Sequence, residues 1–195
     1  MVLGLHVCGI IARVTPIELI FAIGWAAFWL GWFVAARSTK RGRHPWSREA
    51  LIRVIVVAVA FVAARLGAFH GHLTHTGALR SGVGLALFAI GLLFAVWARV
   101  HIGRNWGTPM TQKQDPELVT SGPYHLVRHP IYSGILLAGV GTSVALGWGF
   151  LVIFGLSAIY FVYAATVEEK FMTEQFPDAY PAYKRSSKML IPFVF

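Results

Sequence analysis

Residues 118–134, with the sequence LVTSGPYHLVRHPIYSG, gather polar and turn-forming residues in a chain that is apolar on both sides. Besides Arg128, the stretch contains two tyrosines and two histidines, namely Tyr124, His125, His129 and Tyr132. Polar and charged groups close to a bilayer are costly, and by default they mark a functional site. We therefore interpret this stretch as the wall of a pocket at a membrane surface, with the remaining chain as its scaffold.

The composition predicts an integral membrane protein. Of its 195 residues, 56% are hydrophobic and 13% are charged, whereas soluble domains carry about 25% charged residues. We expect an all-α protein that forms one compact domain. The single cysteine, Cys8, excludes an internal disulfide and a metal site built on thiolates. The net charge of +9 indicates membrane topology and attraction to anionic lipid. No basic stripe interleaved with aromatics is present, so we expect no nucleic-acid partner.

Apolar runs predict about five transmembrane helices. The first three runs lie within residues 1–100, which hold no motif that can be read. The last two are separated only by a Gly-Trp-Gly turn, which predicts a tight helical hairpin within a carboxyl-terminal core at 101–195. The five expected spans are residues 17–36, 50–69, 81–100, 130–146 and 148–167.

Basic loops set the expected orientation. Residues 37–49 carry five Lys or Arg residues and one Glu, so the positive-inside rule places this loop in the cytoplasm and the amino terminus outside. Residues 70–80 hold His70, His72 and His75. Because no carboxylate or thiol lies near these histidines, we expect no metal site.

The expected hairpin returns Glu168 and Glu169 to the membrane surface that carries Arg128 and His129. The tail that follows, to residue 195, is amphipathic, so we expect it to lie on the membrane and to cap a cytoplasmic pocket. Residues forty positions apart in the sequence are thereby predicted to face each other across a cavity.

The residue types predicted at this pocket suit an amino-acid zwitterion. Arg128 or His129 can bind a carboxylate, and the two glutamates can bind an ammonium group. Tyrosine rings can face an adenine or a sulfonium cation. These are the needs of S-adenosylmethionine. The alternative reading of the same residues is that the arginine and the glutamates pair and hold the hairpin to the tail.

Five motifs carry a family resemblance. They are GRNW (103–106), LVTSGPY (118–124), RHPIY (128–132), the acidic pair 168–169, and FPDAYPAYKR followed by LIP (176–192). In these motifs residues 85–195 resemble the isoprenylcysteine carboxyl methyltransferase family and the related phospholipid methyltransferases. The resemblance implies an S-adenosylmethionine pocket on the cytosolic side, roofed by the tail. It implies a lipid-soluble or prenylated methyl acceptor that enters between helices.

The resemblance also implies roles for single residues. It makes Arg128 and Glu168 catalytic. It implies cofactor contacts at Leu118, Val119, Gly122, Tyr124, Arg128, His129, Pro130, Tyr132, Glu168 and Glu169. For an acceptor that must lose a proton, Glu168 is the candidate base.

The chain departs from the family at two places. Pro116 stands where the family often has a histidine. Ala164 and Ala165 stand where the prenylcysteine enzymes tend to carry an arginine, so a carboxylate, an amine or a hydroxyl acceptor all stay open.

Two other function classes remain as alternatives. Membrane sterol reductases that use NADPH share part of the RHPIYSG pattern, but they follow it with an acidic residue, whereas Ile135 and Leu136 follow here. A non-enzymatic membrane protein is the other alternative. The sequence does not predict the oligomeric state.

Overall fold

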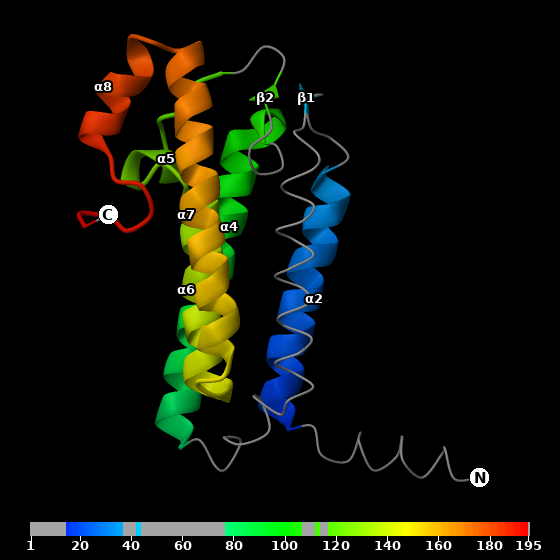
Figure 1. Ribbon diagram of the computed structural model, residues 1–195. Coiled ribbons are helices and arrows are strands. Elements are labelled where there is room, and N and C mark those ends of the chain that lie inside the picture. The colour runs from blue at the N-terminus through cyan, green and yellow to red at the C-terminus, as the bar shows by residue number, and fades with distance from the viewer. Residues whose placement is uncertain (1–14, 37–41, 44–76, 107–111, 114–116, 195) are drawn as a thin grey trace. The chain divides into compact units, whose positions relative to one another are not determined.

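A computed structural model describes residues 15–36, 42–43, 77–106, 112–113 and 117–194 (Figure 1). The expected span at 50–69 and the three loop histidines lie outside these ranges. The chain divides into two compact units, residues 1–35 and residues 36–195.

Helix α2 (Pro16–Ala36) forms the described part of the first unit and matches the first expected span. Thr15 and Glu18 form a capping box, since the Thr15 N–H donates to Glu18 Oε2 at 2.7 Å and the Glu18 N–H donates to Thr15 Oγ1 at 3.4 Å. Pro16 occupies the first helical position, where its missing N–H costs nothing. The sequence TPIE therefore supplies a local signal for the start of the helix.

Helices α4 (Ala78–Ile102) and α6 (Pro130–Leu146) pack closely in the second unit through a set of glycines. A Cβ added to Gly91 would overlap the Ala138 backbone nitrogen and lie 2.5 Å from the Gly134 carbonyl. We call this contact the glycine seam; its glycines are Gly84, Gly91, Gly134 and Gly141. Small residues permit such close approach between membrane helices.

Helix α7 (Phe150–Gln175) follows α6 after only residues 147–149, and the two helices contact each other. Helix α6 ends at Gly147, whose φ of 137° excludes most side chains. The expected end of the second helix was wrong: α7 continues past residue 167 and contains Glu168 and Glu169. It stops at Phe176, because Pro177 disfavours helical geometry in the residue before it.

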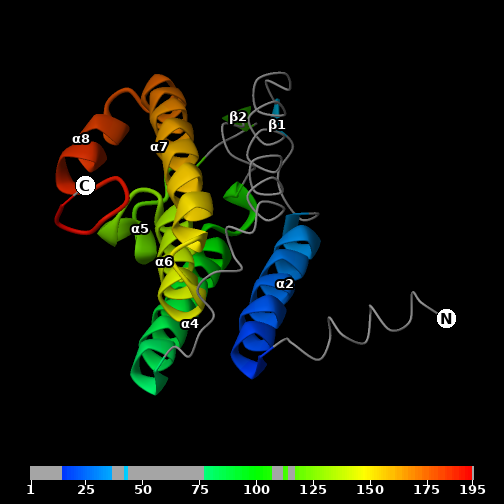
Figure 2. The same ribbon diagram turned by 60° about the horizontal axis from the view of Figure 1, so that its bottom comes forward.

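The remaining elements are short. They are the 3₁₀ helix η1 (Gly103–Asn105), α5 (Pro123–Leu126), α8 (Ala179–Ser186), and the two-residue strands β1 (Gly42–Arg43) and β2 (Gln112–Lys113), which pair antiparallel. In the views of Figures 1 and 2, α5, α8 and the carboxyl-terminal segment lie together beside the second half of α7. The all-α prediction is confirmed apart from this strand pair.

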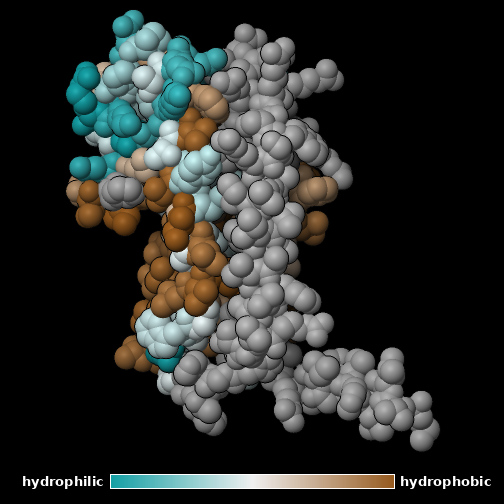
Figure 3. Space-filling view, viewed as in Figure 1, coloured by the Kyte–Doolittle hydropathy of each residue, from teal (hydrophilic) through white to brown (hydrophobic). Residues whose placement is uncertain are grey.

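Within the described ranges, three helices are long and apolar enough to cross a membrane: Pro16–Ala35, Ala78–Asn105 and Phe150–Gln175. Helix α6 is apolar but shorter. Figure 3 shows the hydrophobic residues on the lower part of the helices and the hydrophilic ones on the lobe around α8. These features are those of a multi-pass membrane protein, as the composition predicted.

Candidate functional site

Arg128 and Glu169 form the centre of a buried polar cluster. Arg128 lies just before α6, and its Nε donates to Glu169 Oε1 on α7 at 2.6 Å. Their side chains are only 7% and 3% exposed. A charged hydrogen bond in such a dry setting is strong, and loss of either partner leaves a buried charge. The predicted approach of these two segments is therefore found in the structure.

The carboxyl-terminal tail holds the same arginine through main-chain carbonyls. The guanidinium Nη1 donates to the carbonyl oxygens of Lys184 and Ser187. The backbone N–H groups of Arg128 and His129 donate to the Lys188 and Met189 carbonyls at 2.8 and 3.1 Å. The tail thus completes the cluster. Figure 1 shows the path of the tail past α5.

Lys184 is a member of the cluster that the sequence did not reveal. Its Nζ lies 2.7 Å from Glu169 Oε2, so one buried carboxylate serves both an arginine and a lysine. In the sequence, Lys184 reads only as part of the basic side of an amphipathic tail. Lys184 lies one helical turn after the buried Tyr180 on α8. This spacing was the signal in the sequence that Lys184 lies on the inner side of the helix.

His129 lies between the two glutamates. Its Nδ1 is 3.4 Å from Glu168 Oε2 and its Nε2 is 3.5 Å from Glu169 Oε1. Burial opposes a charge on the ring, but hydrogen bonding to the two carboxylates outweighs burial and raises the pKa of His129 above its ordinary value.

Tyr132 fixes the second carboxylate. Its hydroxyl donates to Glu168 Oε1 at 2.6 Å. The Tyr132 ring lies parallel to the His129 ring at 5.6 Å and to the Phe161 ring at 4.5 Å. Phe161 is two helical turns before Glu168 on α7, and it is a further neighbour that the motifs did not mark. The stack holds Glu168 at the edge of the cluster, with its side chain 25% exposed.

Tyr124 connects to the cluster through the tail. The Tyr183 hydroxyl donates to the Tyr124 carbonyl, and the Ser187 hydroxyl donates to the Tyr183 carbonyl. Burial raises the pKa of the Tyr183 hydroxyl to about 12, so this donor keeps its proton at neutral pH. Tyr124 itself is buried, with its hydroxyl 3.4 Å from the Ala98 carbonyl.

The other predicted contact residues lie beside α5. Gly122 begins α5 with a φ of 59°, and an added Cβ would meet the ring of His101 at 2.7 Å. Leu118 and Val119 are half-buried in the segment without regular secondary structure before α5, and Pro130 is buried at the start of α6. Their contacts with a ligand remain a prediction.

Ala164 and Ala165 explain the departure from the prenylcysteine pattern. Both are fully buried and pack with Tyr132 and Leu190. These positions belong to the apolar core beneath the cluster, where a long cationic side chain would be costly to place.

The cluster has donors and acceptors that fit a charged ligand. Glu168 is the more exposed of the two carboxylates, at 25% against 3% for Glu169. Arg128 and Glu169 touch each other directly, so the cavity expected between the two segments stays a prediction. The described residues show no group of three or more His, Cys, Asp or Glu that could hold a metal ion.

A family model described as phospholipid methyltransferase matches residues 79–179, more than half of the chain, including nearly all of α4, all of α6 and the glutamate pair. The chain belongs to this family. A protein-S-isoprenylcysteine O-methyltransferase B from Arabidopsis thaliana is 29% identical over 118 residues, which cover 58% of this chain and 60% of that protein.

Other relatives carry different names. The cobalt-zinc-cadmium resistance protein CzcN from Cupriavidus metallidurans is 33% identical over 144 residues, covering 70% of this chain and 61% of the relative. Methanethiol S-methyltransferase 1 from Bradyrhizobium diazoefficiens is 35% identical over 78 residues, covering 40% and 27%. The chain thus spans less than two thirds of the length of each of these relatives.

Proposed function

We propose that the chain is an integral membrane methyltransferase that uses S-adenosylmethionine and methylates a lipophilic or prenylated acceptor at the cytoplasmic face. The observation that supports it most is the meeting of Arg128, His129 and Tyr132 with Glu168 and Glu169. All five residues lie inside the segment that matches the phospholipid methyltransferase family.

The cluster divides into an anchoring half and an accessible half. Arg128, Glu169 and Lys184 pair with one another and tie α7 to the tail. Glu168, whose side chain is 25% exposed, is the part that a ligand can reach, and Tyr132 holds its carboxylate. When bound, S-adenosylmethionine would supply an electrophilic methyl group on a sulfonium. The carboxylate of Glu168 suits its ammonium or sulfonium charge, and the residues around α5 would hold its nucleoside.

Two residues carry the chemical part of the proposal. Glu168 would accept the proton of an amine or hydroxyl acceptor as the new bond forms. Arg128 would fix the geometry of the cluster, because holding the reacting groups in line supplies much of the rate. The packed rings of Tyr132 and Phe161 would keep water away from the reacting groups.

The proposal also covers the membrane arrangement. The chain would have five spans, with the amino terminus outside. Helices α6 and α7 would form a hairpin that dips in from the cytoplasmic side, and the tail would cap the pocket that opens there. Residues 1–100 would form the membrane scaffold and residues 101–195 the methyltransferase core.

Calorimetric titration of the detergent-solubilised protein tests the cofactor. We expect S-adenosylmethionine to bind and NADPH not to bind. Binding of NADPH alone would move the protein to the reductase class, and binding of neither ligand would leave a non-enzymatic role.

Radiolabelled methyl transfer to a total lipid extract tests the reaction. We expect Arg128→Ala and Glu168→Ala each to abolish transfer, while Glu174→Ala, a change of an exposed carboxylate later on α7, has no effect. Binding titrations on the same variants distinguish a variant that no longer binds the cofactor from one that binds it but does not transfer the methyl group. Transfer at the wild-type rate in both cluster variants would refute the site.

A further inference from the structure

The last described residues carry large apolar side chains that the protein leaves uncovered. Ile191, Phe193 and Val194 are 54%, 90% and 73% exposed. Leu126 on α5 is 42% exposed, and it neighbours the same tail because Val127 pairs with Lys188. We call these four residues the apolar ledge. Exposed apolar groups gathered in this way mark an interaction surface.

The segment just before the tail residues of the ledge is fixed by hydrogen bonds. The carbonyl oxygens of four consecutive residues, Ser187 to Leu190, accept hydrogen bonds from Arg128, His129 and Ser133. Leu190 is therefore fixed in position, and residues 191–194 continue from it. The ledge residues of the tail therefore follow directly after an anchored segment.

The backbone at the ledge turns these side chains outward. Phe193 has a φ of 67°, which is unusual for a bulky residue. The turn that contains it closes with a hydrogen bond of 3.2 Å from the Val194 N–H to the Ile191 carbonyl. Strain of this kind persists where the surroundings hold it, and here it presents a phenyl ring to the outside.

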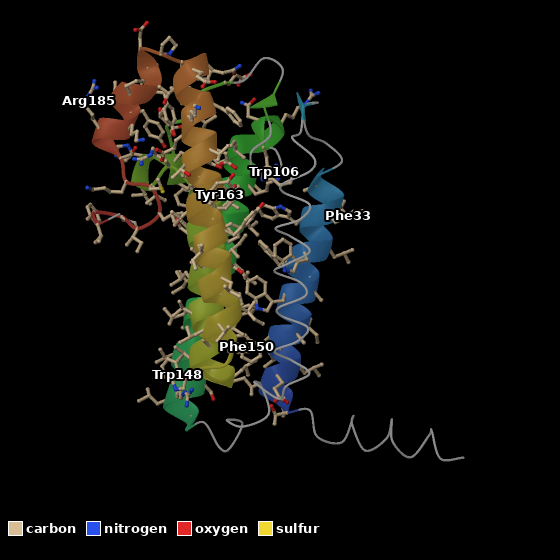
Figure 4. All side chains as sticks on the ribbon, in the orientation of Figure 1. Phe33, Trp106, Trp148, Phe150, Tyr163 and Arg185 are labelled. Atoms are coloured by element: carbon tan, nitrogen blue, oxygen red, sulfur yellow. The ribbon has the colours of Figure 1, made fainter. Side chains whose placement is uncertain are left out.

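Positive charge accompanies the apolar residues. Arg185 and Lys188 are exposed on the same tail, and Arg185 projects from the outer side of α8 in Figure 4. Residues 179–194 contain no acidic side chain. An amphipathic segment with this pairing of apolar and basic residues is typical of binding to anionic lipid.

The ledge also adjoins the apolar belt of the helices. In Figure 3 the lobe around α8 is hydrophilic above and hydrophobic along its lower edge, on the side where the hydrophobic part of the helices begins. The lobe that carries the ledge thus has an apolar edge at the level where the helices become apolar, and a protein partner there would have to share this side with the bilayer.

We propose that the apolar ledge inserts into the interfacial zone of an anionic leaflet, with Arg185 and Lys188 contacting the lipid headgroups. The lipid is recognised by its negative charge and its acyl boundary. This contact goes beyond the proposed methyl transfer and does not depend on it.

Site-directed fluorescence on the full chain in nanodiscs tests this proposal. In a Cys8→Ser background, Val194→Cys carries an environment-sensitive NBD label, and Glu174→Cys on the polar end of α7 carries the same label as a matched control. The nanodiscs contain phosphatidylcholine alone or with phosphatidylglycerol, each with or without doxyl-labelled lipid. We expect blue-shifted emission and doxyl quenching at position 194, and neither at position 174.

Variants that remove one positive charge from the tail test the role of anionic lipid. In the phosphatidylglycerol nanodiscs, Arg185→Gln and Lys188→Gln should each lower the ratio of inserted to uninserted tail by about five-fold. In phosphatidylcholine they should change little. Insertion that is equal in both lipids and insensitive to these variants would overturn the anionic part of the proposal. A label at 194 that stays in water, or that is shielded without doxyl quenching, would overturn insertion itself.

Discussion

The glycine seam and the Arg128–Glu169 cluster both involve α6, and they are held by opposite means. The seam brings α4 and α6 together through backbone contacts at residues such as Gly91 and Gly134, and it depends on the absence of side chains. The cluster joins the start of α6 to α7 and the tail, and it depends on charges that need each other. We therefore expect an added side chain to disrupt the seam, and the removal of a charged side chain to disrupt the cluster.

Glu169→Ala should have the largest effect on stability. It leaves the buried Arg128 without its carboxylate, and such a loss costs about 3–5 kcal/mol. Lys184 adds little to this figure because its side chain is 52% exposed. Reversible unfolding in mixed micelles measures the change, with Glu174→Ala as the control. Equal unfolding midpoints for the two variants would show that the pair contributes nothing.

Gly91→Ala tests the seam with a single methyl group. The methyl would overlap backbone atoms of α6, which cannot rotate away, so we expect a loss of about 3 kcal/mol in the free energy of unfolding. Gly82→Ala, on the same helix with nothing within 4 Å of an added Cβ, should be neutral or stabilising by about 0.5 kcal/mol. A seam variant as stable as its control would mean that α4 and α6 do not pack this closely.

Tyr132→Phe removes one hydrogen bond from the cluster and keeps the ring stack. The Glu168 carboxylate is partly exposed and can turn to water, so the expected loss is about 1.5 kcal/mol, at the lower end for a charged acceptor. The same unfolding measurement applies. Phe161→Leu is the matched change on the other ring, and it should leave the Tyr132–Glu168 bond intact.

The smallest effect expected is a pH dependence from His129. The charged and titratable groups that face it are Tyr132, Glu168 and Glu169, and Glu169 is in turn paired with Arg128 and Lys184. Because folding raises the pKa of His129, the protonated ring stabilises the fold. This contribution is complete below the unfolded value of about 6.5. It is lost as pH rises from there through the higher folded pKa.

Unfolding measured from pH 6 to pH 9 detects this loss. His129→Gln should flatten the curve in that range. A wild-type curve that is flat, or that rises with pH, would contradict the pairing of the ring with the two carboxylates.

The sequence predicts the helices well where local residues decide them. Helix α6 has the expected bounds, because Pro130 suits a helix start and Gly147 a helix end. The expected end of α7 was wrong because the apolar run stops at Val167 while the helix does not. The glutamates that end the run point into the cluster, so tertiary contacts favour helix through them.

The contact between Arg128 and Glu169 was predictable because both residues belong to short polar motifs in an otherwise apolar chain. The role of the tail was not. Its main-chain carbonyls do most of the binding, and a carbonyl has no signature in sequence. Lys184 was missed for the same reason, since its position follows from where those carbonyls place α8.

The tail binds Arg128, His129 and Ser133 through its main-chain carbonyls, so substitutions and deletions in the tail should have different effects. Four successive carbonyls, from Ser187 to Leu190, are aligned with fixed donors. Exchanging a side chain in this segment leaves every carbonyl in place, whereas removing one residue moves each of them out of step with its donor. Gene variants that shorten this segment by a single codon should therefore be far more damaging than missense changes at the same positions.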